Sequence, residues 1–234
     1  MKEYIILAGG LGTRLQSVVN DVPKCMAPIA GKPFLYYILK YAEQQKAEHI
    51  ILSLGYKSEI VTEWLKTTHF GLEISYIVEE EPLGTGGAIK YAFEKVRGTQ
   101  ALAINGDTFF SIDILGLGSF HTLHNADISI ALKPMTDFDR YGSVEINKDM
   151  RVTKFNEKQF CDKGLINGGI YAINKTIFDK FRFPGKFSFE TDVLEGKLEE
   201  LDIYGYIQDA YFIDIGIPTD YEKANKDFSD SAAF

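Results

Sequence analysis

A glycine-rich segment near the amino terminus carries the strongest chemical signal in the sequence. Residues Leu7 to Leu15 read LAGGLGTRL and follow a short apolar run. Gly9, Gly10 and Gly12 let the backbone bend sharply and approach a ligand, and the exposed N–H groups of such a loop attract anions. A dinucleotide fingerprint counted from Gly10 would need glycine where Leu15 stands, and no G-x-x-x-x-G-K-[ST] occurs. The segment predicts a phosphate site and argues against an NAD enzyme and a P-loop kinase.

Two basic side chains accompany this loop. Arg14 lies inside it, and Lys24 follows in the proline-braced segment VPKCMAPIAGKP. A guanidinium and a lysine ammonium can neutralise a triphosphate and the charge on a departing pyrophosphate. The pair therefore predicts chemistry at a nucleoside triphosphate.

Two aspartates follow apolar segments far apart in the chain. Asp107 stands in INGDTFF just after a predicted buried strand, and Asp214 stands in FIDIG. Open α/β sheets bind ligands at the carboxyl ends of their strands. A lone aspartate there more often caps a helix. Two carboxylates with few other ligands suit Mg²⁺, which keeps waters and bridges substrate phosphates.

A second glycine-rich turn occurs in EEEPLGTGGAIKYA, where Gly84 and Thr85 open a predicted helix. The free N–H groups at a helix start favour a ligand rich in acceptors. The carboxylates of Glu79 to Glu81 would repel phosphate, so we expect them to face solvent or the edge of a base. A plain helix start is the alternative interpretation.

The elements that must position these residues alternate between strand and helix patterns. The segments are Tyr4–Leu7, Phe34–Gln44, His49–Leu54, Glu59–Lys66, Ile74–Val78, Ala88–Val96 and Ala101–Asn105. This alternation predicts an α/β fold, a Rossmann-like three-layer α/β/α arrangement with a mixed, mostly parallel central sheet.

Antiparallel additions are expected after Asp107. They include a strand in DISIALKP, a hairpin turning at Asn147 to Asp149 and a strand in LINGGIYAINK. Phe187 to Leu201 is predicted to be mostly helical, AYFIDIG to form a late strand, and a last helix to start at Pro218. With no linker or repeat, we expect one domain over residues 1–228 and a frayed tail over 229–234.

Composition narrows the functional classes. The chain has 234 residues, 45% of them hydrophobic, and a formal net charge of −8. This balance supports a folded core and argues against long-range attraction to nucleic acid or an anionic membrane. Two distant cysteines encode neither a disulfide framework nor a zinc site. No signal peptide or membrane span is predicted, so a cytoplasmic location is expected.

The combination of LAGGLGTRL and PKCMAPIAGKP resembles the amino-terminal signature of the sugar-1-phosphate nucleotidyltransferases. The resemblance continues through IDIGIPTDYEKA and so covers nearly the whole chain. Cys25 and Gln159 stand where the family commonly has proline. The resemblance implies a nucleotide-binding half over about residues 1–110 and a sugar-binding half over about 111–228.

The resemblance also implies residue roles. It assigns Mg²⁺ at the α-phosphate to Asp107 and Asp214, and catalytic charge to Arg14, Lys24 and Lys158. The nucleotide-binding residues it implies are Leu7, Ala8, Gly9, Gly10, Gly12, Thr13, Gly84, Thr85 and Gly106.

For the sugar, carboxylates and amides can bind hydroxyls, glycines let the ring approach, and lysine can meet the sugar phosphate. An exposed hairpin charge pair and simple aromatic packing are the alternatives for these segments. The implied sugar-binding residues are Tyr141, Gly142, Glu157, Lys158, Asn167, Gly168, Gly169, Lys186 and Glu190.

Substrate choice is less constrained. The segments DFDRYG, LINGGIY, KFSFE and PLGTGGAI resemble most the members that use GTP and a heptose 1-phosphate. Nothing in spacing or charge selects guanine or a seven-carbon sugar. Uridylyl, cytidylyl or thymidylyl transfer to glucose, mannose or N-acetylmuramic acid 1-phosphate remains an alternative, as does a non-catalytic regulator that binds nucleotide sugars. A homodimer is expected only because it is common in the family.

Overall fold

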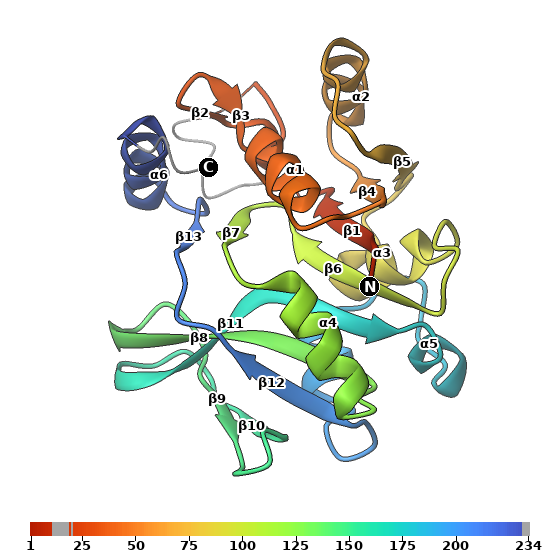
Figure 1. Ribbon diagram of the computed structural model, residues 1–234, viewed down its shortest axis with the longest axis vertical. Helices are drawn as coiled ribbons and strands as arrows, with labels where there is room; N and C mark the ends of the chain where they lie inside the picture. The colour runs from red at the N-terminus through yellow and green to blue at the C-terminus, as the bar shows by residue number, and fades with distance from the viewer. Residues whose placement is uncertain (11–18, 20, 231–234) are drawn as a thin grey trace.

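The computed structural model describes residues 1–10, 19 and 21–230 and is built around one central sheet (Figure 1). The sheet has seven strands in the order β12-β8-β11-β6-β1-β4-β5. Their bounds are β12 (Ile203–Ile207), β8 (Ile128–Phe138), β11 (Cys161–Asn174), β6 (Gln100–Asn105), β1 (Glu3–Ala8), β4 (His49–Leu54) and β5 (Glu73–Val78). All neighbouring pairs are parallel except the two that β11 makes with β6 and β8. The predicted mixed, mostly parallel sheet is confirmed.

Helices cover both faces of this sheet. They are α1 (Phe34–Gln44), α2 (Ser58–Thr67), α3 (Gly84–Ala92), α4 (Ile114–Leu123), α5 (Ile177–Lys180) and α6 (Pro218–Asp230). Ile6 of β1 packs in one core cluster with residues of α1, α4 and α6, and Ile5 packs in the other with residues of α3 and α5. Successive side chains of a strand point to opposite faces, so β1 feeds both cores. The predicted three-layer arrangement is confirmed.

Three small two-stranded sheets lie outside the central one: β2 (Pro28–Ile29) with β3 (Lys32–Pro33), β9 (Val144–Ile146) with β10 (Val152–Phe155), and β7 (Thr108–Phe110) with β13 (Phe212–Asp214). The predicted hairpin is β9–β10, whose turn is closed by the Asn147 side chain accepting from the amides of Asp149 and Arg151. A short 3₁₀ helix, η2 (Lys24–Met26), precedes β2.

Two helix predictions differ from the structure. The predicted helix is α3, which begins at Gly84 as expected but ends at Ala92 and not at Val96. Its glycine-rich first turn packs tightly on the segment around Phe187. A Cβ at Gly86 would lie 2.3 Å from the Phe187 ring. The helix expected over Phe187–Leu201 is a π-helix, η3 (Phe189–Glu195), followed by turns. The edge strand β12 was not predicted, because IYGYI has little pattern of its own.

At the carboxyl terminus, α6 continues through Asp230, so the tail expected to fray from residue 229 begins as helix. Residues 231–234 lie outside the described part of the chain. Among the described residues, no helix has the length and apolar character needed to cross a membrane.

Candidate active site

A cavity of about 570 Å³ opens at the carboxyl ends of β1, β4 and β6. These strands are parallel, so their ends meet at one edge of the sheet, where α/β proteins bind ligands. The predicted nucleotide-site residues that line it are Leu7, Ala8, Gly9, Gly10, Lys24, Gly84, Thr85, Gly106 and Asp107. Gly12, Thr13 and Arg14 lie outside the described residues. The fold thus brings the described members of the predicted set together around one cavity. Their contact with nucleotide stays a prediction.

Glu79 forms a fixed acceptor on the wall of this first cavity. Its Oε1 accepts from Ser53 Oγ at 3.0 Å, and its Oε2 accepts from the Leu83 amide at 3.0 Å. A carboxylate has room for about four hydrogen bonds, so both oxygens keep acceptor capacity. Of the three glutamates expected to face solvent or a base, Glu79 and Glu80 line the cavity. Glu79 can therefore bind a ligand edge that presents adjacent donors.

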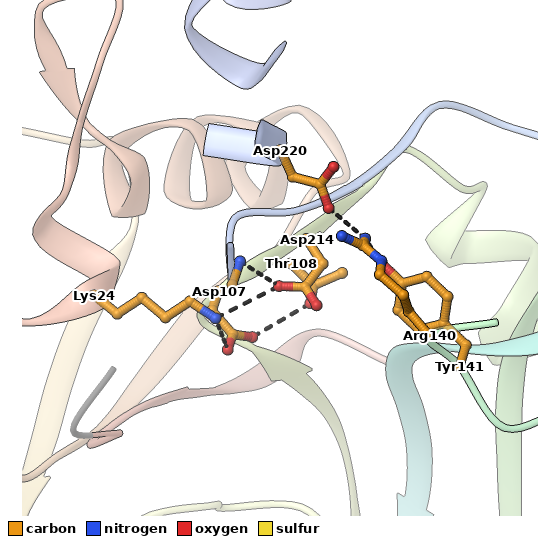
Figure 2. A network of polar contacts seen from close by, with 8 residues as sticks. Lys24, Asp107, Thr108, Arg140, Tyr141, Asp214 and Asp220 are labelled. Atoms are coloured by element: carbon orange, nitrogen blue, oxygen red, sulfur yellow. Dashed lines mark hydrogen bonds and ion pairs between the residues drawn. The ribbon is translucent and has the colours of Figure 1, made fainter. Parts of the chain in front are cut away.

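Lys24 joins the two predicted metal-binding aspartates (Figure 2). Its Nζ lies 2.6 Å from Asp107 Oδ2 and 3.5 Å from Asp214 Oδ1. The small β7–β13 sheet brings the aspartates together, because Asp214 pairs in register with Thr108. The Lys24 side chain is only 10% exposed, whereas those of Asp107 and Asp214 are 39% and 26% exposed. The carboxylates thus remain open toward a ligand while the lysine lies beneath them.

These aspartates suit a hard cation. They already converge on one positive charge, the Lys24 ammonium, and both offer only oxygen. Within the described ranges, no group of three or more His, Cys, Asp or Glu side chains could enclose a metal. Two carboxylates completed by water and phosphate oxygens are what Mg²⁺ commonly uses, whereas Zn²⁺ prefers a fuller set of protein ligands. Asp107 and Asp214 therefore fit Mg²⁺ bound together with a phosphate substrate.

A second cavity of about 260 Å³ contains most of the predicted sugar-site residues. Those lining it are Tyr141, Gly142, Glu157, Lys158, Asn167 and Glu190. Burial raises the pKa of Tyr141, and the charge of Asp214 raises it further. Tyr141 and Asp214 also line one neighbouring hollow, so Tyr141 connects the second cavity with the aspartate pair. Lys186 is exposed, and neither it nor Gly168 or Gly169 lines either cavity. Sugar contact by those three stays a prediction.

Several polar residues that line the cavities were not predicted, and Glu195 and Asn105 are two of them. Glu195 lines the second cavity, where burial raises its pKa and the charges of Glu157 and Glu190 raise it further. An α-helix would point Glu190 and Glu195 in different directions, but the wider π-helix turns residues five apart toward one side. Asn105 lines the first cavity, and its Oδ1 is buried with no partner among the described residues. The segment INGD offered a signal for Asn105, an amide ending a buried strand.

A mostly parallel sheet with such a cavity at the carboxyl ends of its strands is typical of α/β proteins that bind a ligand there. The chain belongs to the nucleotidyl transferase family, whose model matches residues 3–231. It is 51% identical to the D-glycero-alpha-D-manno-heptose 1-phosphate guanylyltransferase of Aneurinibacillus thermoaerophilus, over 96% of this chain and 97% of that one. It is 48% identical to the enzyme of the same name from Campylobacter jejuni, over 94% and 96%.

Solved structures agree with this relationship. The crystal structure of HddC from Yersinia pseudotuberculosis complexed with GMP-PN superposes with a TM-score of 0.88 at 41% identity. The match covers 97% of this chain and all of that one. The resemblance inferred from LAGGLGTRL and PKCMAPIAGKP is confirmed.

Proposed function

We propose that this protein transfers a guanylyl group from GTP to D-glycero-α-D-manno-heptose 1-phosphate, giving GDP-heptose and pyrophosphate. The observation that carries the proposal is the Lys24–Asp107–Asp214 cluster. Lys24 and Asp107 line the first cavity, and Asp214 lines a shared surface hollow with Tyr141 of the second cavity. The cluster provides charge where a triphosphate in the first cavity would meet a sugar phosphate from the second. The names of relatives about half identical over nearly their full lengths support the choice of substrates.

Glu79 supports guanine as the base. An ionised carboxylate only accepts hydrogen bonds, and Glu79 is held in place by Ser53 and the Leu83 amide. Guanine presents adjacent N1–H and N2–H donors on one edge. Adenine and cytosine place an acceptor beside their amino group, and uracil and thymine flank their N–H with carbonyl oxygens. Only guanine among the five offers a carboxylate two neighbouring donors, and mismatched acceptors there would stay unpaired.

The reaction we propose is an in-line displacement. An oxygen of the sugar 1-phosphate attacks the α-phosphorus of GTP, and the bond to pyrophosphate breaks. Because the attacking oxygen is already anionic, no side chain needs to remove a proton. Catalysis then rests on alignment and on neutralising charge in a preorganised site.

Lys24 and Lys158 supply the positive charge among the described residues. Lys24 lies at the first cavity and Lys158 at the second, so they can meet the triphosphate and the sugar phosphate from different sides. Arg14, outside the described residues, is proposed to act on the triphosphate as well. Mg²⁺ held by Asp107 and Asp214 would add further neutralising charge on the phosphates.

The second cavity supports a polyhydroxylated substrate. Glu157, Glu190 and Glu195 offer acceptors for sugar hydroxyls, and Asn167 adds an amide. We place the reaction in the cytoplasm, where GDP-heptose would serve the assembly of a capsule or other surface glycan.

The test is pyrophosphate release with Mg²⁺ from each of GTP, ATP, CTP, UTP and dTTP. Each nucleotide is paired with heptose, mannose and glucose 1-phosphates. We expect GTP with the heptose phosphate to exceed every other pair by about tenfold or more in kcat/KM. Another preferred pair would keep the mechanism and overturn the substrates. No release from any pair would favour a non-catalytic regulator.

A further inference from the structure

The two cavities share a hydrogen-bonded wall. Thr85 lines the first cavity and Glu190 the second, and Thr85 Oγ1 donates to Glu190 Oε2 at 2.6 Å. The same Thr85 oxygen accepts from the Phe189 amide at 2.8 Å, and Ser188 Oγ donates to Glu190 Oε2 at 3.1 Å. One oxygen of Glu190 is therefore fixed by two hydroxyls, from Thr85 at the start of α3 and from Ser188.

The other oxygen of Glu190 faces a residue that lines neither cavity. Tyr171, on β11, is 1% exposed, and its ring packs edge-on against Phe189 at 5.1 Å between centroids. Its hydroxyl donates to Glu190 Oε1 at 3.5 Å and accepts from Asn167 Nδ2 at 2.9 Å. Burial keeps the pKa of Tyr171 well above its usual value, so the hydroxyl keeps the proton that it donates. One buried hydroxyl thus contacts two polar side chains of the second cavity.

The backbone of β11 is distorted at the point where this contact forms. Asn167 pairs with Leu132 and Tyr171 with Ile130, so four steps on β11 cover two steps on β8. In a regular strand, residues four apart are separated by about 13 Å, too far for this amide and hydroxyl to meet easily. The intervening Gly168 and Gly169 form a bulge, and Gly169 has a φ of +73° that only glycine adopts readily.

The bulge also orients the amide of Asn167. Asn167 Oδ1 accepts from the Gly169 amide at 3.0 Å, which leaves Nδ2 directed at Tyr171. Bulges next to active sites commonly redirect a side chain. The double glycine of LINGGIY thereby has a structural reason that does not require contact with the sugar.

We propose that Tyr171 is a positioning residue for the sugar phosphate: its hydroxyl holds Glu190 and Asn167 in the orientation in which they bind sugar hydroxyls. The proposal rests on the function proposed above and goes further, because it assigns substrate binding to a core hydroxyl that the substrate does not touch. Without the hydroxyl, Glu190 Oε1 and Asn167 Nδ2 lose a shared partner and can turn away from the cavity.

The decisive variant is Tyr171→Phe, which removes one oxygen and keeps the ring. Steady-state pyrophosphate release is measured with the sugar phosphate varied at saturating GTP, and with GTP varied at saturating sugar phosphate. We expect the KM for the sugar phosphate to rise about tenfold and the KM for GTP to stay within about twofold of wild type. Tyr4→Phe is the matched control, because Tyr4 is also fully buried and its hydroxyl donates to the Gln45 carbonyl away from both cavities.

A double-mutant cycle separates positioning from general destabilisation. In a Glu190→Gln background, the added effect of Tyr171→Phe on the KM for the sugar phosphate should shrink, because both changes act through one carboxylate. Fully multiplicative effects would contradict the proposal. So would an unchanged KM for the sugar phosphate in Tyr171→Phe, or equal increases for both substrates.

If Tyr171→Phe does not fold, the opposite side of the wall provides the test. Thr85→Val removes the hydrogen bond to Glu190 and should raise the KM for the sugar phosphate, whereas Thr85→Ser should restore it. An unchanged KM in Thr85→Val would overturn the proposal. Wild-type turnover with a different sugar phosphate would overturn only the proposed substrate, and the same ratios are then measured with that sugar. No turnover with any sugar phosphate would overturn both.

Discussion

At the amino ends of β1 and β4, Glu3 accepts hydrogen bonds from the backbone amides of Arg97 and Gly98 at 3.0 and 2.7 Å. His49 lies between Glu3 Oε1 and Ser75 Oγ, at 3.0 and 2.8 Å. At the carboxyl ends of the same strands, Asn105 Oδ1 is buried with no partner among the described residues, and the carboxylates of Asp107 and Asp214 stay partly open. The polar groups of one end bind each other, and those of the other keep capacity for a ligand.

This difference shows that the volume of a cavity does not by itself identify a ligand-binding site. The amino end also has a cavity, of about 390 Å³, which is larger than the 260 Å³ cavity lined by Glu157 and Lys158. Around the larger cavity, Glu3 and His49 already have partners. Free hydrogen-bonding capacity and uncompensated charge distinguish the functional end from the structural one.

The largest expected effect comes from removing a charge at the carboxyl end. Asp107→Asn keeps the size of the side chain but loses a negative charge beside Lys24 and at the proposed Mg²⁺ site. We expect kcat to fall by about 10² or more, the range seen when an electrostatic stabiliser is lost. Lys24→Ala should behave similarly. Pyrophosphate release measures the effect, and near-wild-type turnover would remove the altered residue from the chemistry.

A smaller effect on rate is expected from Glu79→Gln. The amide places a donor where guanine also presents donors, while Ser53 and the Leu83 amide still surround the side chain. We expect kcat/KM for GTP to fall by about 10- to 100-fold and the preference for GTP over ATP to narrow. Competition between the two nucleotides measures this preference. An unaltered ratio would show that the base is recognised elsewhere.

At the amino end, Glu3→Gln should affect folding and leave catalysis alone. The new amide group would oppose backbone N–H donors of Arg97 and Gly98, so we expect a loss of about 1–3 kcal/mol in the free energy of unfolding. Urea denaturation gives this value, and kcat should stay within about twofold of wild type. A large loss of kcat in a stably folded variant would break the comparison between the two ends.

The smallest predicted effect is a pH dependence of the stability that Glu3→Gln loses relative to wild type. Burial alone would raise the pKa of Glu3, but hydrogen bonds from Arg97, His49 and Gly98 outweigh it and lower the pKa below its usual value. The unfolded chain therefore takes up the proton first as pH falls, so the stabilisation by Glu3 is present above about pH 4.5 and is lost below it. The difference in unfolding free energy between wild type and Glu3→Gln should shrink from about pH 6 toward pH 3.5. A constant difference would contradict this assignment.

Local sequence patterns predicted much of the fold. The bounds of Phe34–Gln44 and His49–Leu54 agree with α1 and β4, because an apolar helical stripe after Pro33 and a continuous apolar run are local signals. The pairing of β7 with β13 was not predictable, because these three-residue strands are joined by a contact between distant parts of the chain. That pairing is what places Asp214 beside Asp107.

The residues of the candidate site also divide into those with a local sequence signal and those without one. Glycine loops and basic segments could be located because their chemistry lies in consecutive residues, such as Gly9 and Gly10 or Glu157 and Lys158. Tyr171 and Glu195 could not, because their roles depend on a bulge and a π-helix that the amino-acid pattern does not encode locally. Residues that we propose to bind ligands directly gave sequence signals more often than residues that we propose to orient them.

Amide hydrogen exchange with a non-hydrolysable GTP analogue and Mg²⁺ tests most directly which end of the sheet binds the nucleotide. Ligand contact slows local opening, so protection maps the bound surface. We expect slower exchange at residues 79–85 and 105–108, with no change at residues 97–100. Protection at residues 97–100 without protection at the carboxyl end would contradict it.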